Sequence, residues 1–517
     1  MKVFFDTNII IDTTIRVEKY PDSAILLNNL LDTPGFSLWI STITINNTEY
    51  IVSRLGSKEK VQDVLTLLNE EFSIIPFRKS VFVKALKTGG PDFEDAIQMA
   101  SAEEMGMDYL VTRNKDHFKG SKVPVVTPSE FLEKWNAGEF DTVTHVPFLD
   151  LKAQHHQVYN EIDNRITEII SNTAFILGKH VDEFETRFAQ IQGAKYCIGV
   201  SSGTDALHIA LMTLGIGPGD KAIVPVNTFI ATAEAVSLCG AEPVFIDCDE
   251  YYNISISKLK EYLKNLGNKP GNRIPKAIIP VHLYGQPADM DAILKLAQEY
   301  DMAVVEDCCQ AHLARYMNKL VGNLGQFGAF SFYPGKNLGA YGEAGALVTN
   351  DEKLYIKAKM IRQHGEIERY QHQLVGHNYR MEALQGAVLS AKLPYLEEWT
   401  EKRRANAKLY NDLLKNINGI QIPKEIPDIY AVYHLYVIQC DNRDVLKNHL
   451  HEKGVMTGLH YPKPLHLQPA YAALGYSGGD FPLAESSAQR ILSLPMYPEL
   501  TKSQIKYVAD CIKEYMK

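Results

Sequence analysis

Short apolar runs alternate with amphipathic stretches along the chain, and one interruption of this pattern stands out. The alternation is typical of α/β domains with parallel sheets, whose buried strands are short and apolar and whose helices carry one apolar face. The interruption follows the helix-like segment Ser129–Trp135 and is polar, contains glycine and lacks periodicity. We therefore expect a domain at 1–135, a linker at 136–146 and a larger part from 147 onwards.

The larger part is itself expected to divide, because a single core stops growing well below its length. Strand-like and helical segments alternate from about 195 to 390, which predicts a large α/β domain at 147–395. The helical run Leu393–Tyr410 leads into a smaller α/β lobe at 396–517. Within this lobe, 432–440 and 454–462 are predicted strands.

Composition narrows the class of protein. The net charge of −9 gives no indication of a nucleic-acid partner for the whole chain. The seven cysteines lack metal-ligand spacing and predict reduced thiols in a cytosol. No 18 consecutive residues are apolar, so no membrane-spanning helix is expected. Together these features predict a soluble, cytoplasmic protein.

Lys336 lies in an unusual place, within a loop rich in glycine and aromatic residues between two apolar runs. Lysines are mostly solvated, and a semi-buried amine can have a lowered pKa and form Schiff bases. Taken alone, however, Lys336 is more simply interpreted as a surface lysine. Three other segments favour the catalytic interpretation.

The first is the strand-like 196–200 followed by Ser-Ser-Gly-Thr and a helix, where Gly203 would let exposed amides bind a phosphate. The second is 302–307, an apolar run that ends on Asp307 at the edge where parallel sheets bind ligands. The third is Phe229, whose ring could stack on a cofactor. The simpler interpretations are an ordinary helix cap, a capping aspartate and a core phenylalanine.

The order of motifs SSGTDAL, NTFIATAEA, HLYGQPADMD, VVEDCCQAH, SFYPGKNLG, GHNYRMEALQGA, HYPKPLH and LSLPMYP resembles the DegT/DnrJ/StrS family of nucleotide-sugar aminotransferases. The resemblance extends from about Pro147 to the C-terminus. It implies a fold-type I transferase that depends on pyridoxal 5′-phosphate (PLP), with a large mixed-sheet domain and a small C-terminal lobe. It also implies a homodimer whose active sites are shared between subunits.

The resemblance assigns a role to each matching position. Lys336 would hold the cofactor as a Schiff base, and Asp307 would pair with the pyridine nitrogen as the ring's electron sink requires. The resemblance also implies that Gly203, Thr204 and Ser331 bind the phosphate, together with Asn378 of the neighbouring subunit. Gln310 would lie near the ring oxygen, and Phe229 would stack on the ring face. Leu313 departs from the glycine usual in the family, and Cys308–Cys309 replaces smaller residues. Both departures lie beside the site and bear on the identity of the substrate, and not on the chemistry of the reaction.

The implied reaction transfers an amino group, with glutamate as the expected donor, to a keto group of a nucleotide-linked sugar. The motifs favour a 3-keto-6-deoxyhexose or UDP-3-keto sugar, in amino-sugar and polysaccharide biosynthesis; a 4-keto acceptor is the alternative. A dehydratase of the same family would carry histidine in place of Lys336. The chain could also be a nuclease or toxin whose PLP half is regulatory, or a sensor in which PLP occupancy controls the N-terminal domain.

Residues 1–135 carry several acids near predicted strand ends. Carboxylates in such places can hold Mg²⁺ or Mn²⁺, which can activate water for phosphodiester cleavage. DTN near the start, an acid about forty residues later, and DFEDA followed by LVTRN resemble the PIN domain, an α/β fold of many toxin-type ribonucleases. The metal ligands implied by this resemblance are Asp6, Glu49, Asp95 and Asp116.

Asp116, the fourth implied ligand, departs from the pattern by one position. His117 stands where the pattern often has aspartate, and Asn114 could also serve as the ligand. Acidic residues outnumber basic ones by 20 to 15 in residues 1–140, with no basic run to bind an RNA backbone. An active ribonuclease that binds RNA and an inactive PIN scaffold are therefore both compatible with the sequence.

Overall fold

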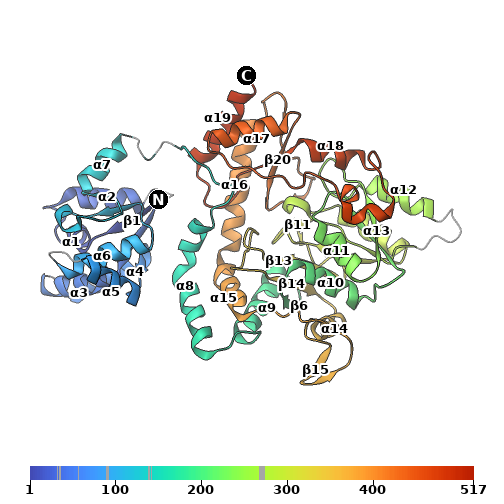
Figure 1. Ribbon diagram of the computed structural model, residues 1–517, viewed down its shortest axis with the longest axis horizontal. Coiled ribbons are helices and arrows are strands. Elements are labelled where there is room, and N and C mark those ends of the chain that lie inside the picture. The colour runs from blue at the N-terminus through green and yellow to red at the C-terminus, as the bar shows by residue number, and fades with distance from the viewer. Residues whose placement is uncertain are drawn as a thin grey trace. The chain divides into compact units, whose positions relative to one another are not determined.

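The computed structural model describes residues 1–517 except 32, 34–35, 56–57, 89–91, 138–139, 141–142 and 267–273. The chain forms two compact units, one of residues 1–143 with 155–160, and one of residues 144–154 with 161–517 (Figure 1). Part of the predicted linker lies outside the described residues. No helix in the described part of the chain is long and apolar enough to cross a membrane.

The N-terminal unit is built on a five-stranded parallel sheet in the order β3-β2-β1-β4-β5. The strands are β1 (Lys2–Phe5), β2 (Ser37–Ser41), β3 (Ser73–Ile75), β4 (Tyr109–Val111) and β5 (Val125–Val126). The helices are α1 (Thr7–Thr14), α2 (Pro21–Leu31), α3 (Thr42–Leu55), α4 (Lys58–Glu71), α5 (Lys79–Thr88), α6 (Phe93–Glu104) and α7 (Pro128–Asn136).

Alternate residues of β1 explain why helices cover both faces of this sheet. Val3 and Phe5 pack with residues of α1, α2, α3, α4 and α7, whereas Phe4 packs with residues of α6. Since side chains of a strand point alternately to opposite faces, a strand buried on both faces has no polar positions. The continuous apolar run Val3–Phe5 therefore predicts a central strand.

The larger unit contains a seven-stranded sheet in the order β6-β14-β13-β10-β9-β7-β8. The strands are β6 (Tyr196–Val200), β7 (Lys221–Pro225), β8 (Glu242–Ile246), β9 (Ala277–Ile278), β10 (Ala303–Asp307), β13 (Phe327–Ser331) and β14 (Gly345–Thr349). β14 runs antiparallel to both of its neighbours, and the other pairs are parallel. The predicted mixed sheet and the fold class are confirmed.

Two layers of helices enclose this sheet, as the two apolar clusters on its faces show. One cluster packs against α9 (Lys179–Gln192), α12 (Ile256–Leu266), α13 (Met290–Glu299) and α15 (Ala383–Lys392). The other packs against α10 (Gly203–Thr213), α11 (Ile230–Leu238) and α14 (Glu352–Arg362). Each central strand contributes alternate residues to the two clusters, Ile223 to one and Val224 to the other.

The C-terminal part adds a three-stranded antiparallel sheet of β17 (Ile420–Gln421), β19 (Tyr436–Cys440) and β20 (Ile491–Leu494). The unit is completed by α8 (Leu151–Asn172) apart from its residues 155–160, and by the helices α16 (Leu396–Leu414), α17 (Arg443–Glu452), α18 (Pro482–Arg490) and α19 (Lys502–Tyr515) (Figure 1). Small pairs are formed by β11 (Arg315–Tyr316) with β12 (Lys319–Leu320) and β18 (Ile429–Tyr430), and by β15 (Glu366–Glu368) with β16 (Gln371–His372).

The strand predicted at 454–462 is wrong. Only isolated bridges form there, from Val455 to Val146 in parallel and from Gly458 to Ser493 in antiparallel orientation. Because the pairing partner and the direction change within three residues, no continuous ladder can form. The segment instead brings His460 and Tyr461 to the site described next.

Candidate active site

The predicted cofactor residues gather at one edge of the seven-stranded sheet. β10 ends on Asp307 and β13 ends on Ser331, and these strands are parallel neighbours. β6 runs in the same direction because both it and β13 are antiparallel to β14, and it leads directly to Gly203. The carboxyl ends of the strands therefore meet where α/β sheets bind ligands.

Asp307 is buried, and its carboxylate is held in a fixed orientation. The Thr232 hydroxyl donates to Oδ2 at 2.8 Å, and the Cys309 amide donates to Oδ1 at 3.1 Å. These two donors fix the plane of the carboxylate. Asp307 is therefore preorganised to face a cationic nitrogen.

Lys336 lies in the loop between β13 and β14, where its amide donates to the Tyr333 carbonyl at 2.8 Å. Burial lowers the pKa of the Lys336 amine, and the nearby Cys309, Asp307 and Glu343 act in the opposite direction. Its Nζ has no hydrogen-bond partner among the residues that the structure describes. An amine with a lowered pKa and no partner is suited to act as a nucleophile and as a proton carrier.

A cradle for an anion lies at the start of α10. A Cβ added to Gly203 would lie 2.7 Å from Cβ of Ser331 and 2.9 Å from Sγ of Cys309, so only glycine fits. Ser202 caps the helix by accepting from the Asp205 amide at 3.1 Å. Within the described residues the amides of Gly203 and Thr204 have no acceptor. Free amides at a helix N-terminus beside the Ser331 hydroxyl form a phosphate site.

Gln310 and Phe229 both lie against Tyr461. The Gln310 side chain donates to the Tyr461 hydroxyl at 3.2 Å and accepts from the Tyr284 amide at 2.7 Å. The ring of Phe229 is half exposed, and its centroid lies 5.5 Å from that of Tyr461. Phe229 is therefore not a core residue, which removes the simpler interpretation of this side chain.

Asn378 is exposed in the segment between α14 and α15, where it accepts from Nε of Arg380 at 3.0 Å. This segment runs past the end of β6, since the Ser201 amide donates to the Tyr379 carbonyl. Its implied reach to the phosphate of a neighbouring subunit stays a prediction.

Sequence reasoning did not single out Thr232, Tyr461 or the histidines around Lys336. Thr232 could have been found, because it lies one helical turn from Phe229 within the same motif. His460 and Tyr461 lie in the HYPKPLH motif, but their position depended on a segment interpreted as a strand. Their importance is visible only once that segment meets the sheet edge.

The nearby histidines are held neutral. Burial and the charge of Lys336 lower the pKa of His460 to about 4 and that of His312 to about 3. His460 is bonded to the Ser493 hydroxyl at 2.8 Å and stacks on Phe148. Burial likewise holds the pKa of His434 well below its usual range. These imidazoles shape the site without adding positive charge beside Lys336.

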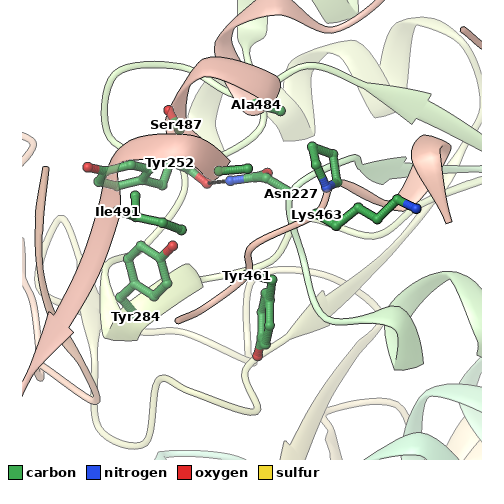
Figure 2. A pocket seen from close by; sticks show the side chains of 10 residues that line it. Asn227, Tyr252, Tyr284, Tyr461, Lys463, Ala484, Ser487 and Ile491 are labelled. Atoms are coloured by element: carbon green, nitrogen blue, oxygen red, sulfur yellow. Dashed lines mark hydrogen bonds between the residues drawn. The ribbon is translucent and has the colours of Figure 1, made fainter. Parts of the chain in front are cut away.

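A small pocket adjoins Tyr461. Figure 2 shows the side chains of Tyr252, Tyr284 and Tyr461 around it, with Asn227 bonded to the Tyr252 carbonyl. The Tyr284 hydroxyl donates to the His460 carbonyl. The pocket therefore shares a wall with the site of Gln310 and Phe229, and its lining can donate hydrogen bonds to a polar ligand.

His282, Glu306 and Cys308 form a buried group with metal-like spacing, and their bonds explain it without a metal. Glu306 accepts amide hydrogens of Gly322, Leu324 and Gly325 at 2.7–2.8 Å. Nε2 of His282 lies 3.1 Å from this carboxylate, and its Nδ1 accepts from the Ala288 amide. With both ring nitrogens of His282 and the Glu306 carboxylate engaged in hydrogen bonds, the pair anchors the loop of Gly322, Leu324 and Gly325.

The N-terminal unit contains a second, acidic pocket. Asp6 is buried and accepts from Thr112 at 2.6 Å and from Gln98 at 3.1 Å, and burial raises its pKa. Glu94 bonds the same Gln98 at 3.4 Å, and burial raises its pKa too. The Asp95 carboxylate lies 2.8 Å from Nδ1 of His117, and the charge of Asp95 also raises the pKa of Asp6.

Two of the four implied metal ligands lie at the surface. Glu49 is exposed on α3, and the side chain from this helix that bonds the pocket is Asn47, a partner of Glu94. Asp116 is exposed and forms an ion pair with Lys119 at 2.9 Å. The structure thus brings Asp6 and Asp95 together with Glu94, Asn47 and His117. Glu94 was missed because it stands beside Asp95 in the same motif.

Known proteins resemble both units. A model of the DegT/DnrJ/EryC1/StrS aminotransferase family matches residues 156–513, and a PIN domain model matches residues 2–116. A dTDP-3-amino-3,4,6-trideoxy-α-D-glucose transaminase of Streptomyces venezuelae is 42% identical over 370 residues, 72% of this chain and 96% of that protein. A UDP-2-acetamido-2-deoxy-3-oxo-D-glucuronate aminotransferase of Pseudomonas aeruginosa is 41% identical over 71% of this chain and 99% of that protein.

Solved structures agree with the fold. The crystal structure of S. venezuelae DesV has a TM-score of 0.69 and 40% identity, covering 72% of this chain and 99% of that one. NtdA from Bacillus subtilis, solved with bound cofactor PMP, has a TM-score of 0.66 and 29% identity, covering 78% of this chain and 95% of that one.

Proposed function

Because the chain belongs to the DegT/DnrJ/EryC1/StrS aminotransferase family, we propose that its larger unit is a cytoplasmic PLP-dependent transaminase of nucleotide-linked 3-keto sugars. The observation that carries the proposal is the unpartnered, low-pKa amine of Lys336 at the sheet edge that also carries Asp307 and Gly203. The 3-keto acceptor is favoured by the names of the relatives, several of which form 3-amino sugars.

The residues fit the cofactor in four respects. The free amides of Gly203 and Thr204 and the Ser331 hydroxyl suit a phosphate. The Asp307 carboxylate, held by Thr232 and Cys309, suits a protonated ring nitrogen. The half-exposed ring of Phe229 suits stacking on the cofactor ring. The side-chain amide of Gln310, which bonds Tyr461, suits a hydrogen bond to the ring oxygen.

When bound, PLP supplies an electron sink for a carbanion formed at the donor carbon. The Lys336 amine would hold the cofactor and, once released from it, would accept the proton from the donor carbon, which requires an uncharged amine. Burial favours this state by lowering the pKa of Lys336. The fixed carboxylate of Asp307 would face the ring nitrogen and favour its protonated form. The neutral His460 and His434 leave the Lys336 amine free of a competing cation.

The test compares Lys336→Ala with wild type by visible absorption and by turnover of a panel of dTDP- and UDP-keto sugars with glutamate. We expect the variant to lose the cofactor absorption band that borohydride traps in wild type, and to lose at least about 10³-fold in kcat. Lys319→Ala, on an exposed β-hairpin of the same unit, is the matched control. An unchanged band in Lys336→Ala would refute the proposal. Turnover of 4-keto sugars alone would refute the 3-keto assignment.

We also propose a homodimer with shared sites, in which Asn378 of each subunit serves the phosphate of the other. Its support is that exposed aromatic residues lie near Lys336 along the chain, namely Tyr333 and Tyr341. Lys336→Ala and Asn378→Ala subunits, each inactive alone, should regain activity when mixed, since a mixed dimer contains one intact site. Mixing without recovery would place Asn378 outside the site or in its own subunit's site.

For the N-terminal unit we propose a single divalent-ion site, for Mg²⁺ or Mn²⁺, on Asp6, Glu94 and Asp95. The support is that Gln98 bonds both Asp6 and Glu94 and that the charge of Asp95 acts on both carboxyl groups. Burial raises the pKa of all three acids, and a bound ion would lower these pKa values. Mn²⁺ should raise the melting temperature of this unit in wild type but not in Asp6→Asn. Cleavage of single-stranded RNA that depends on Mn²⁺ and on Asp6 would establish a ribonuclease. Metal binding without cleavage would leave the inactive scaffold, and absence of both effects would refute the site.

A further inference from the structure

Lys392, the last residue of α15, is buried, with 1% of its surface exposed. It forms no direct ion pair with a carboxylate in the described part of the chain, although the charge of Glu499 acts on it from further away. Burying an ammonium group without a directly bonded counter-ion is costly unless its hydrogen atoms are all engaged. A lysine in such a place calls for a reason other than core packing.

Three groups surround the ammonium. Nζ donates to the Gly339 carbonyl at 2.8 Å and to Oε1 of Gln154 at 3.0 Å. It also lies 4.5 Å from the ring centroid of Tyr341, within the range of a cation–π contact. These three contacts match the three hydrogens of an ammonium. Two of the three partners, Gly339 and Tyr341, belong to the loop that carries Lys336.

This loop is folded tightly between residues 332 and 340. A Cβ at Gly339 would lie 2.2 Å from the Pro334 carbonyl oxygen, so the two sides of the loop touch around Lys336. The Ala340 amide closes the loop by donating to the Phe332 carbonyl at 2.8 Å. Displacing Gly339 would therefore move the backbone on which the Lys336 side chain stands.

Several bonds hold the loop. Asn337 donates to the Val432 carbonyl at 3.1 Å near one end, and the Tyr341 amide donates to Oε1 of Gln385 at 3.0 Å near the other. The only side-chain donor to the Gly339 carbonyl in the described residues is Lys392. We propose that Lys392 is a positioning residue for the reaction, whose buried ammonium fixes the Gly339 end of the loop and thereby aims the Lys336 amine at the cofactor. This inference rests on the proposed function in taking Lys336 as the cofactor lysine.

Gln154 provides a matched control. Gln154→Leu removes one bond of the ammonium and weakens the tie to α8, but it leaves the bond to Gly339 in place. Lys392→Met keeps the apolar stem and removes both bonds. A purely structural role of Lys392 in joining α8 to α15 would make the two variants alike. A role in positioning predicts that only Lys392→Met affects Lys336.

The experiment adds PLP to cofactor-free protein and follows the growth of its visible absorption band, together with kcat and KM for the sugar. Lys392→Met should form the band at least about 10-fold more slowly and lose at least about 10-fold in kcat, with KM within about 3-fold of wild type. Gln154→Leu should stay within about 3-fold of wild type in all three. Equal effects of the two variants, or a wild-type rate in Lys392→Met, would overturn the inference.

If Lys392→Met does not fold, Lys392→Gln replaces it in the experiment, because the glutamine side chain can still donate one hydrogen bond. An intermediate rate of band formation is expected, and a wild-type rate would contradict the inference. Lys336→Ala separates the two proposals. If it keeps the band, the proposed function itself fails; if it loses the band while Lys392→Met behaves as wild type, only the positioning role fails.

Discussion

At the scale of single residues, Gly203 shows why one position in the candidate phosphate site has to be glycine. Its φ lies outside the left-handed region, so its backbone does not require glycine. The requirement comes from Ser331 and Cys309, which leave no room for a Cβ. These neighbours lie far from it in the chain, so the sequence indicated a glycine beside a phosphate site but not what makes it necessary.

Gly203→Ala is therefore expected to weaken PLP binding by at least about 10-fold, because the added methyl group displaces the Ser331 side chain from the phosphate cradle. A titration of cofactor-free protein with PLP, followed by absorbance, measures this. Gly217→Ala is the control, since its φ is ordinary and the nearest atom to its Cβ would be 3.9 Å away. Equal affinities of the two variants would show that the cradle is not at Gly203.

At the scale of elements, α1 and the loop after β4 are joined by a buried ion pair. Asp12 of α1 is fully buried and lies 2.5 Å from Nε of Arg113, whose guanidinium also stacks over Tyr20. Burial raises the pKa of Asp12 to about 6, although Arg113 and Arg16 act in the opposite direction. The desolvation of the carboxylate thus outweighs its ion pair.

This shift predicts a pH dependence of the N-terminal unit. Since the folded-state pKa of Asp12 exceeds the unfolded value of 3.8, the folded unit binds more protons between about pH 4 and 6, and its unfolding free energy falls as pH rises through that window. The contribution is on the order of 3 kcal/mol.

Urea unfolding from pH 4 to 7 measures this dependence. The unfolding free energy of Asp12→Asn should fall less steeply with rising pH than that of wild type. A residual slope from Asp6, Glu94 and Asp95 is expected. An unchanged slope would contradict the assignment.

At the scale of the whole molecule, the two units have separate cores and separate candidate sites. A ligand stabilises the structure that binds it. The three tryptophans report on the units separately, because Trp39 and Trp135 lie in the N-terminal unit and Trp399 in the larger one.

Saturating PLP is therefore expected to raise the melting temperature of the larger unit by several degrees and to leave that of the N-terminal unit unchanged. Thermal unfolding followed by tryptophan fluorescence, in wild type and in Trp399→Phe, separates the two transitions. A shift of the transition that remains in Trp399→Phe would mean that cofactor occupancy is transmitted to the N-terminal unit, as a sensor would require.

The sequence by itself determined the α/β class of both units and the family of the larger one. Apolar runs such as Val3–Phe5 and the ordered motifs around Gly203, Asp307 and Lys336 are local patterns, and buried strands and tight loops impose their requirements locally. The predicted domain boundaries and the roles of the site residues stay predictions.

Only the tertiary structure decided which side chains surround these positions. The bond from Thr232 to Asp307, the bond from Lys392 to Gly339 and the bond between Asn47 and Glu94 all depend on contacts between elements far apart in the chain. The physical reason is that desolvation and hydrogen bonding act over a few ångströms in space, so the pKa of Lys336 and the identity of its supports follow from packing and not from neighbours in sequence.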